Sequence, residues 1–266
     1  YKPRRRRLPP NKTTVETLAM LGITTLRPYA DGMVPTAPNA ANTDETRAWI
    51  WGPVPELMKF QDGTEIRSRE DWQRRRRELL EEFDREVYGR TPKRLPKVTW
   101  KLVEEKQEKI GEYEVVRKSL RGIVDNRAYP AISVEIPLTL VTPVQAKGRV
   151  PVILEFGFGI RPGGAAGPTR PNQAPAWTQQ ILKRGWSYAV IVPNAFQADS
   201  GAGLRSGIIG LVNKGMLRAP DDWGALKAWA WGASRALDYL QSDKAVDGKK
   251  VAIEGLSRYG KAALVT

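Results

Sequence analysis

The sequence predicts a three-layer α/β fold with a mostly parallel central sheet. Three nearly continuous apolar runs, at residues 150–156, 187–192 and 251–254, are typical of strands that are covered on both faces. Segments with helical spacing of apolar residues separate these runs. The resulting order of strand, helix, strand, helix and strand favours parallel strands joined by right-handed crossovers. A hydrophobic content of 41% is sufficient for a core of that size.

Two regions are expected along the chain. Residues 1–65 are rich in Pro, Thr, Asn and Gly, which predicts an extended segment that wraps around the rest of the protein. Residues 66–266 are expected to form the N-terminal part of a single α/β domain whose C-terminal part is absent. A helix begins there after Ser68, with a capping-box pattern, and ends at Gly89 and Pro92. Its apolar positions are Trp72, Leu79, Leu80, Phe83 and Val87.

The sheet is expected to begin with antiparallel strands. Residues 98–103, 113–120 and 131–141 alternate between apolar and polar side chains before the three apolar runs begin. One crossover helix is predicted at about 174–184 and ends at Gly185. A second begins at Asp221 and Asp222 and continues to Leu240. The long, Gly-rich loop at 193–220 that precedes this helix is of the kind that often carries function.

Composition limits the possible chemistry. The chain has no Cys and no His, so it can form no disulfide and no thiolate or imidazole metal site, and we expect neither metal nor cofactor. The net charge of +14 suits an anionic partner. Arg4–Arg7 lie in a Pro-flanked tail and Arg74–Arg77 on a helix rich in Glu, which predicts a flexible arm and an ion-paired, solvated face. Basic residues are not interleaved with aromatic ones, so we expect no nucleic-acid binding, whereas an anionic polysaccharide would satisfy the same charge.

The chain contains neither a membrane-spanning apolar run nor a signal-peptide pattern. No apolar stretch approaches the roughly 18 residues that cross a bilayer, so no membrane partner is expected. The first residue is Tyr1 and not Met, which fits a processed protein or a trimmed one.

A candidate nucleophile lies close to the end of the chain. The last apolar run leads directly into Gly255-Leu256-Ser257, and a helix is predicted to begin at Arg258. A serine at such a junction needs a residue without a side chain beside it, as in the nucleophile elbow Gly-x-Ser-x-Gly. Here the second glycine, Gly260, is one position late, and Tyr259 stands in its usual place. A serine that merely caps the helix is the alternative.

Two cations follow the serine. Lys261 is four residues after Ser257, so both are expected on one face of the helix. Arg258 offers a backbone N–H at the helix N-terminus and a guanidinium, and both can stabilise a developing oxyanion. The alternative is that both are ordinary surface cations. A further oxyanion amide is predicted within 156–159 (Phe-Gly-Phe-Gly), where glycines have steric uses as well.

The segment 255–263, Gly-Leu-Ser-Arg-Tyr-Gly-Lys-Ala-Ala, resembles the Gly-Cys-Ser-Arg-x-Gly-Lys-x-Ala signature of the glucuronoyl esterases, carbohydrate esterase family 15. The late glycine is the rule in that family. Residues 222–240 and 83–92 resemble the helix before the nucleophile strand and the end of the N-terminal helix in bacterial members. The likeness extends from about residue 70 to the end, and Leu256 replaces a frequent Cys.

This resemblance implies an α/β-hydrolase fold and a serine carboxylic-ester hydrolase, 4-O-methyl-glucuronoyl methylesterase, active in lignocellulose degradation. Its substrate would be the ester between 4-O-methyl-D-glucuronic acid of glucuronoxylan and lignin alcohols. Ser257 would be the nucleophile, Arg258 would line the oxyanion hole and Lys261 would bind sugar hydroxyls. The family's catalytic His and acid follow the nucleophile helix, so we expect a further C-terminal segment to supply them.

Two alternatives to this function stay open at the level of sequence. The first is an acetyl or feruloyl xylan esterase with the same elbow, and the second is a non-catalytic carbohydrate-binding module. Asp199, Asp221 and Glu254 precede Ser257 and match no triad position. The implied polymeric substrate predicts a secreted or periplasmic bacterial protein.

Overall fold

The computed structural model describes residues 12–25, 40–42, 44–49, 52, 54–157 and 176–266. The chain divides into two units, Tyr1–Leu57 and Met58–Thr266. The first unit contains the helix α1 (Lys12–Met20) and the 3₁₀ turn η1 (Glu45–Arg47), two elements that the extended-segment prediction did not include. The second unit begins eight residues before the boundary expected at residue 66. Wrapping by residues 1–65 stays a prediction.

The first long helix of the second unit follows its predicted cap. Ser68 Oγ accepts a hydrogen bond from the Asp71 N–H at 3.0 Å, and α2 (Arg69–Phe83) begins there. The helix continues as one π turn, η2 (Asp84–Tyr88), and ends at Gly89, whose φ of +80° favours glycine. The chain then runs alongside the segment before α5 (Ala225–Ser242), where the Arg90 N–H donates to the carbonyl oxygen of Asp221 at 2.7 Å.

Two predictions about α2 were wrong in part. Arg75 is only 4% exposed, so the Arg74–Arg77 run is not uniformly solvated, and its Nη1 lies 3.0 Å from Glu78. The predicted apolar stripe is not buried at its C-terminal end, where Phe83 and Val87 are 51% and 62% exposed. Periodicity identifies an apolar face but not what covers it, and in the described structure these side chains face solvent.

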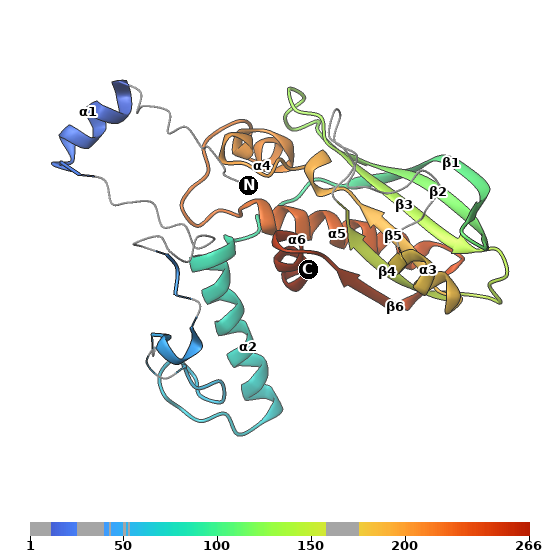
Figure 1. Cartoon of the computed structure of the whole chain (residues 1–266), viewed down its shortest axis with the longest axis horizontal. Coiled ribbons are helices and arrows are strands. Elements are labelled where there is room, and N and C mark those ends of the chain that lie inside the picture. The colour runs from blue at the N-terminus through green and yellow to red at the C-terminus, as the bar shows by residue number, and fades with distance from the viewer. Residues whose placement is uncertain (1–11, 26–39, 43, 50–51, 53, 158–175) are drawn as a thin grey trace. The chain divides into compact units, whose positions relative to one another are not determined.

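A single six-stranded mixed sheet forms the centre of the second unit (Figure 1). Its strands in chain order are β1 (Val98–Ile110), β2 (Tyr113–Val124), β3 (Glu135–Pro143), β4 (Val150–Phe156), β5 (Ser187–Ile191) and β6 (Val246–Glu254). The spatial order is β1-β2-β3-β5-β4-β6. Antiparallel pairing runs from β1 to β5, and β4 pairs in parallel with β5 and β6. Antiparallel entry into a parallel part is therefore confirmed.

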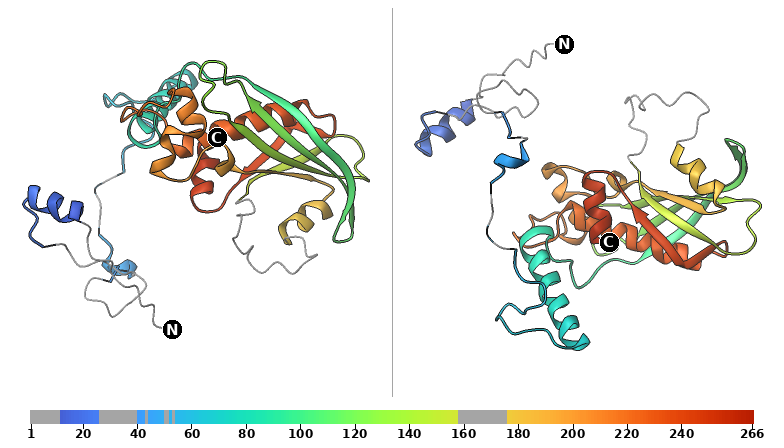
Figure 2. Two further views of the ribbon diagram at one scale, coloured as in Figure 1. Left: turned by 90° about the horizontal axis from the view of Figure 1, so that it is seen from above. Right: turned by 60° about the horizontal axis from the view of Figure 1, so that its bottom comes forward.

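Helices cover both faces of this sheet. Successive strand residues point to opposite sides, so neighbouring residues of one strand belong to different core clusters. Leu140 and Ala189 belong to the large core cluster that includes α5 (Ala225–Ser242) and α6 (Arg258–Val265). Their neighbours Val141 and Tyr188 belong to a second cluster beneath α3 (Ala176–Lys183). Figure 2 shows α5 and α6 on one side of the sheet and α3 on the other. The three-layer prediction is confirmed.

The connection from β5 to α5 is more regular than the loop predicted at 193–220. It contains the 3₁₀ turns η3 (Pro193–Ala195) and η4 (Gly201–Arg205) and the short helix α4 (Gly207–Val212). The helix α5 begins at Ala225 and not at the predicted Asp221. The two aspartates lie outside it because the Asp221 carbonyl and the Trp223 N–H on either side of Asp222 bond with the Arg90 backbone, and Gly224 is the N-cap.

The second crossover helix is tied to the sheet by a buried ion pair. Asp243, at the C-cap of α5, is nearly inaccessible and accepts from Lys118 Nζ on β2 at 2.8 Å. The same carboxylate accepts from the hydroxyl of Tyr239 and the backbone N–H of Ala245. These bonds fix the turn from which β6 departs. None of the helices described is long and apolar enough to cross a membrane.

Candidate active site

Ser257 lies on a sharp turn between β6 and α6. Its backbone has φ 60° and ψ −121°, outside the regions that non-glycine residues normally occupy. Only one other non-glycine residue in the described structure, Lys214, has a positive φ. Strain of this kind costs of order 1–3 kcal/mol and persists where the surroundings impose it. The side chain is exposed to solvent, so the geometry is that of a nucleophile elbow and not of a capping serine.

Two glycines allow this turn to form. A Cβ on Gly255 would lie 2.6 Å from the carbonyl carbon and oxygen of Tyr259, and a Cβ on Gly260 would lie 2.8 Å from the carbonyl oxygen of Gly255. Real Cβ atoms do not approach backbone this closely. The first turn of α6 therefore packs directly against the end of β6. The late glycine of the motif is required because Gly260 is the helix residue at the point of contact.

Tyr259, which stands where the general motif has glycine, anchors the elbow in the core. It is 1% exposed, and its ring lies 5.1 Å from that of Trp229 in an edge-on contact and 6.0 Å from that of Phe156. The three rings join α6, α5 and β4. Since the side chain of Tyr259 points into the core, a large residue at this position does not obstruct the turn.

Arg258 forms an ion pair with Asp199, a residue 59 positions earlier on the β5–α5 connection. The guanidinium is 56% exposed and the carboxylate 32%. This contact brings the connection to the elbow and orients the Arg258 side chain. Asp199 was excluded as a triad member at the level of sequence, and in the structure its partner is Arg258.

Lys261 lies one helical turn after Ser257. Its backbone N–H donates to the Ser257 carbonyl oxygen at 3.2 Å, which places the two residues on successive turns of the same side of α6, as predicted. The Lys261 side chain is exposed, and no carboxylate of the described residues forms an ion pair with it. Its ammonium group is therefore free to meet a ligand near the serine.

Gln197 holds the β5–α5 connection in place and was missed by sequence analysis. Its side-chain amide donates to the Gly203 carbonyl at 3.0 Å and accepts from the Ile209 N–H at 3.0 Å. Its own carbonyl accepts from the Trp229 indole N–H at 2.8 Å. A buried Gln two residues before Asp199 thus fixes the segment that reaches Arg258. No sequence pattern marks it, because its partners are backbone groups.

A pair of carboxyl groups at the ends of β4 and β6 was also missed. Glu155 and Glu254 are register partners on these adjacent parallel strands. Burial and the neighbouring Glu254 raise the pKa of Glu155 to about 7. Both residues lie near the carboxyl edge of the sheet, where α/β folds bind ligands. The only signal in the sequence is an acidic residue near the end of two apolar runs.

The oxyanion amide predicted within 156–159 is not that of Gly157. The Gly157 N–H donates to the carbonyl oxygen of Ile191 at 2.8 Å, so it is committed to the sheet. A Cβ there would lie 2.5 Å from Val190 Cγ1, which is a steric reason for this glycine. Phe158 and Gly159 lie outside the described residues.

No general base contacts Ser257, the candidate nucleophile, in the described part of the chain. No hydrogen bond joins the Ser257 hydroxyl to a carboxylate or an amine there, and the sequence contains no histidine. Nor do three or more Asp or Glu side chains among the described residues gather to hold a metal ion. The elbow, the two cations and the core beneath them form the candidate site.

Comparisons with known proteins agree with this geometry. The sequence model of the family described as fungal glucuronyl esterase matches residues 216–266. A CE15 glucuronoyl esterase from Teredinibacter turnerae is 38% identical, with a TM-score of 0.77 over 94% of this chain and 61% of that one. A glucuronoyl esterase from Solibacter usitatus is 31% identical, with a TM-score of 0.69 over 83% and 61%.

A curated fungal relative, the 4-O-methyl-glucuronoyl methylesterase of Podospora anserina, is 25% identical over 91% of this chain and 43% of its own length. The chain thus spans about three fifths of the two solved bacterial relatives and less than half of the fungal one. Sequence and fold agree over the sheet, the α5 helix and the elbow, and the chain belongs to carbohydrate esterase family 15.

Proposed function

We propose that this protein is a serine carboxylic-ester hydrolase that cleaves the ester between 4-O-methyl-D-glucuronic acid of glucuronoxylan and lignin alcohols. The observation that carries the proposal is the strained backbone of Ser257 on a tight elbow, which can form because Gly255 and Gly260 have no side chains. Family membership supports the substrate class, since its named relatives are glucuronoyl esterases.

The proposed reaction is acyl transfer in two steps. Ser257 Oγ attacks the ester carbonyl carbon and loses its proton to a base, and the C–O bond to the lignin alcohol breaks as the alcohol takes up a proton. Water then hydrolyses the acyl-serine, which restores the Ser257 hydroxyl and leaves a free carboxylate on the glucuronate of the xylan. Arg258 stabilises the negative charge on the carbonyl oxygen in both steps, and Lys261 binds hydroxyl groups of the sugar.

The base is proposed to come from polypeptide outside these 266 residues. A serine hydroxyl is a weak nucleophile at neutral pH without such a partner, and His is the usual one. We propose that the segment supplying the His and its acidic partner packs beside β6 in the complete site. A polymeric cell-wall substrate also supports a secreted or periplasmic location.

The test uses the protein that includes the complete site and follows release of benzyl alcohol from benzyl D-glucuronate. Ser257→Ala is expected to abolish turnover, and the matched control Ser234→Ala is expected to retain it, because that hydroxyl only bonds the Ala230 carbonyl within α5. Turnover by the Ser257 variant would refute the proposal. Hydrolysis of acetylated xylan without hydrolysis of the glucuronate ester would favour the acetyl-esterase alternative.

The two cations are distinguished by different kinetic effects. Arg258→Ala is expected to lower kcat by about 10²-fold, the usual loss for one oxyanion donor. Lys261→Ala is expected to raise KM with little change in kcat, because binding of sugar hydroxyls is the same in ground and transition states. Equal effects of both variants on kcat alone would contradict these separate roles.

A further inference from the structure

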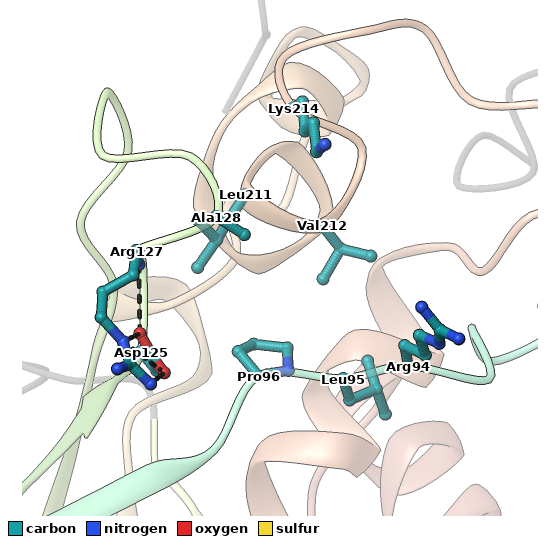
Figure 3. Close-up of a pocket in the computed structure, with 9 residues that line it drawn as sticks. All are labelled: Arg94, Leu95, Pro96, Asp125, Arg127, Ala128, Leu211, Val212 and Lys214. Carbon is teal, nitrogen blue, oxygen red and sulfur yellow. Dashed lines mark hydrogen bonds and ion pairs between the residues drawn. The ribbon is translucent and has the colours of Figure 1, made fainter.

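A second concave surface lies outside the elbow. It is a pocket of about 530 Å³ between the segment before β1, the β2–β3 turn and the end of α4 (Figure 3). These three segments are distant in sequence, and the residues that they contribute are Arg94, Leu95, Pro96, Asp125, Arg127, Ala128, Leu211, Val212 and Lys214. The pocket shares no residue with the elbow, so binding here would be independent of ester hydrolysis.

The charge of this pocket is not balanced. Asp125, the one acid in its lining, forms two-pronged hydrogen bonds with Arg127, at 2.6–3.1 Å. The Arg127 side chain lowers the pKa of Asp125 to about 2, so this pair stays ionised and neutral overall. Arg94 and Lys214 are exposed, and neither forms an ion pair with a carboxylate of the described residues. Two positive charges are therefore left for an anionic ligand.

Lys214 is held at the rim in an unfavourable backbone conformation. Its φ of 53° follows the last turn of α4, at a position where helices usually place glycine. Glycine does follow immediately, as Gly215, whose N–H donates to the Gly210 carbonyl at 2.8 Å. A lysine therefore occupies a position at which the positive φ favours glycine, and such strained residues are common at functional sites.

The remaining walls are aliphatic. Leu95, Pro96, Ala128, Leu211 and Val212 line the pocket, and Figure 3 shows Lys214 and Arg94 on different sides of it. The lining contains no Asn, Gln, Ser, Thr, Tyr or Trp side chain. Neutral sugars depend on such hydrogen-bonding groups, whereas a charged group on an apolar body needs only the cations and the aliphatic walls.

From this combination we infer that the pocket binds an organic carboxylate carried on an apolar ring, with the charges of Arg94 and Lys214 attracting the carboxylate and the aliphatic walls contacting the ring. The choice of ring rests on the proposed function, in which the substrate is a plant cell-wall ester that joins a uronic acid to an aromatic lignin unit, so aromatic acids and uronic acids are the ring carboxylates compared. The aliphatic walls favour the aromatic acid.

Binding can be observed at the pocket itself because the 266-residue chain has no other thiol. Ala128→Cys, labelled with a trifluoromethyl group, places a ¹⁹F reporter on the pocket wall. Its resonance is expected to shift on titration with 4-methoxybenzoate, and a matched label at Lys109→Cys, on the β1–β2 hairpin, is expected not to shift. The neutral 4-methoxybenzamide should bind at least about tenfold more weakly, and D-glucuronate more weakly than the benzoate.

Substitutions then separate the effect of the Lys214 charge from the effect of its strained backbone conformation. Lys214→Gly is expected to weaken 4-methoxybenzoate binding about threefold or more. The melting temperature should at the same time stay the same or rise by about 2 °C, because strain is removed. Arg94→Gln, at an exposed position, should weaken binding similarly without a change in melting, and Lys214→Arg should retain affinity.

Three results would overturn the inference. They are shifts of both labels alike, equal affinity for the benzoate and the benzamide, and unchanged affinity in both Lys214→Gly and Arg94→Gln. Tighter binding of D-glucuronate than of the benzoate would overturn the assignment of the apolar walls. Retained esterase activity in Ser257→Ala, which would refute the proposed function, leaves each of these readouts unaffected, so the two proposals fail separately.

Discussion

Replacing Gly260 by alanine tests the geometry of the elbow directly. The added Cβ would lie 2.8 Å from the carbonyl oxygen of Gly255. That oxygen is a backbone atom at the end of a sheet strand and cannot rotate away, so either α6 or the turn must shift. Gly255→Ala is the more severe change, because its Cβ would meet three backbone atoms of residues 259 and 260 at 2.6–2.9 Å.

The expected magnitude follows from two opposing effects. Alanine is favoured over glycine within a helix by about 1 kcal/mol, and a forced backbone shift in a well-packed region costs about 1–3 kcal/mol. The net change in the free energy of unfolding for Gly260→Ala is therefore a loss of up to about 2 kcal/mol. Gly255→Ala has no helical gain to offset its contacts and should lose about 3 kcal/mol.

Urea unfolding followed by tryptophan fluorescence measures both variants. The matched control is Gly201→Ala, because a Cβ at that exposed glycine meets no atom within 4 Å and should change stability by less than about 0.5 kcal/mol. Gly260→Ala as stable as the control, or more stable, would show that α6 does not touch the end of β6. A Gly255 variant that is less destabilised than the Gly260 variant would contradict the closer backbone contacts at Gly255 as well.

Three further substitutions test the surroundings of the site by urea unfolding. Glu155→Gln should stabilise the chain by about 1–2 kcal/mol at pH 8 but not at pH 4. The pKa of Glu155 is raised to about 7, so ionisation of this carboxyl lowers the free energy of unfolding as the pH rises from about 4.5 to 7. A gain that is independent of pH would contradict this. Asp243→Asn should cost about 2–4 kcal/mol by leaving the half-buried Lys118 without its carboxylate, and an equal effect of Asp238→Asn, an exposed control, would argue against it. Gln197→Ala should cost about 1–3 kcal/mol, since the buried Ile209 N–H loses its acceptor and the Gly203 carbonyl loses one of its donors, and an unchanged midpoint would show that the connection does not depend on Gln197.

The sequence was most informative where the signal is local. The strand β4 has the predicted bounds, because Val150–Phe156 is a nearly continuous apolar run that is buried on one face and half-buried on the other. The strand β6 was predicted to begin at residue 251 but begins at Val246, since residues 247–250 are polar or glycine and lie at the outer strand of the sheet. Hydropathy identifies central strands well and outer strands poorly for this physical reason.

Long-range contacts could not be predicted in the same way. Nothing in the sequence indicates that β5 lies between β3 and β4, because strand order depends on pairing between distant segments. The ion pair of Arg258 with Asp199 depends on the path of the β5–α5 connection, which Gln197 fixes through backbone partners. Ser257 and its glycines were found from sequence because a nucleophile elbow is encoded within six residues.

The position of the second glycine follows from how the helix leaves the turn. In α6 the residue two after the serine, Tyr259, points into the core between Trp229 and Phe156, and the residue three after it touches the end of β6. A helix rotated by one residue, about 100°, would exchange these two positions and require glycine at the first. The spacing Gly-x-Ser-x-x-Gly therefore encodes a helix orientation as well as a tight turn. An aromatic residue between serine and glycine is the core anchor that selects that orientation.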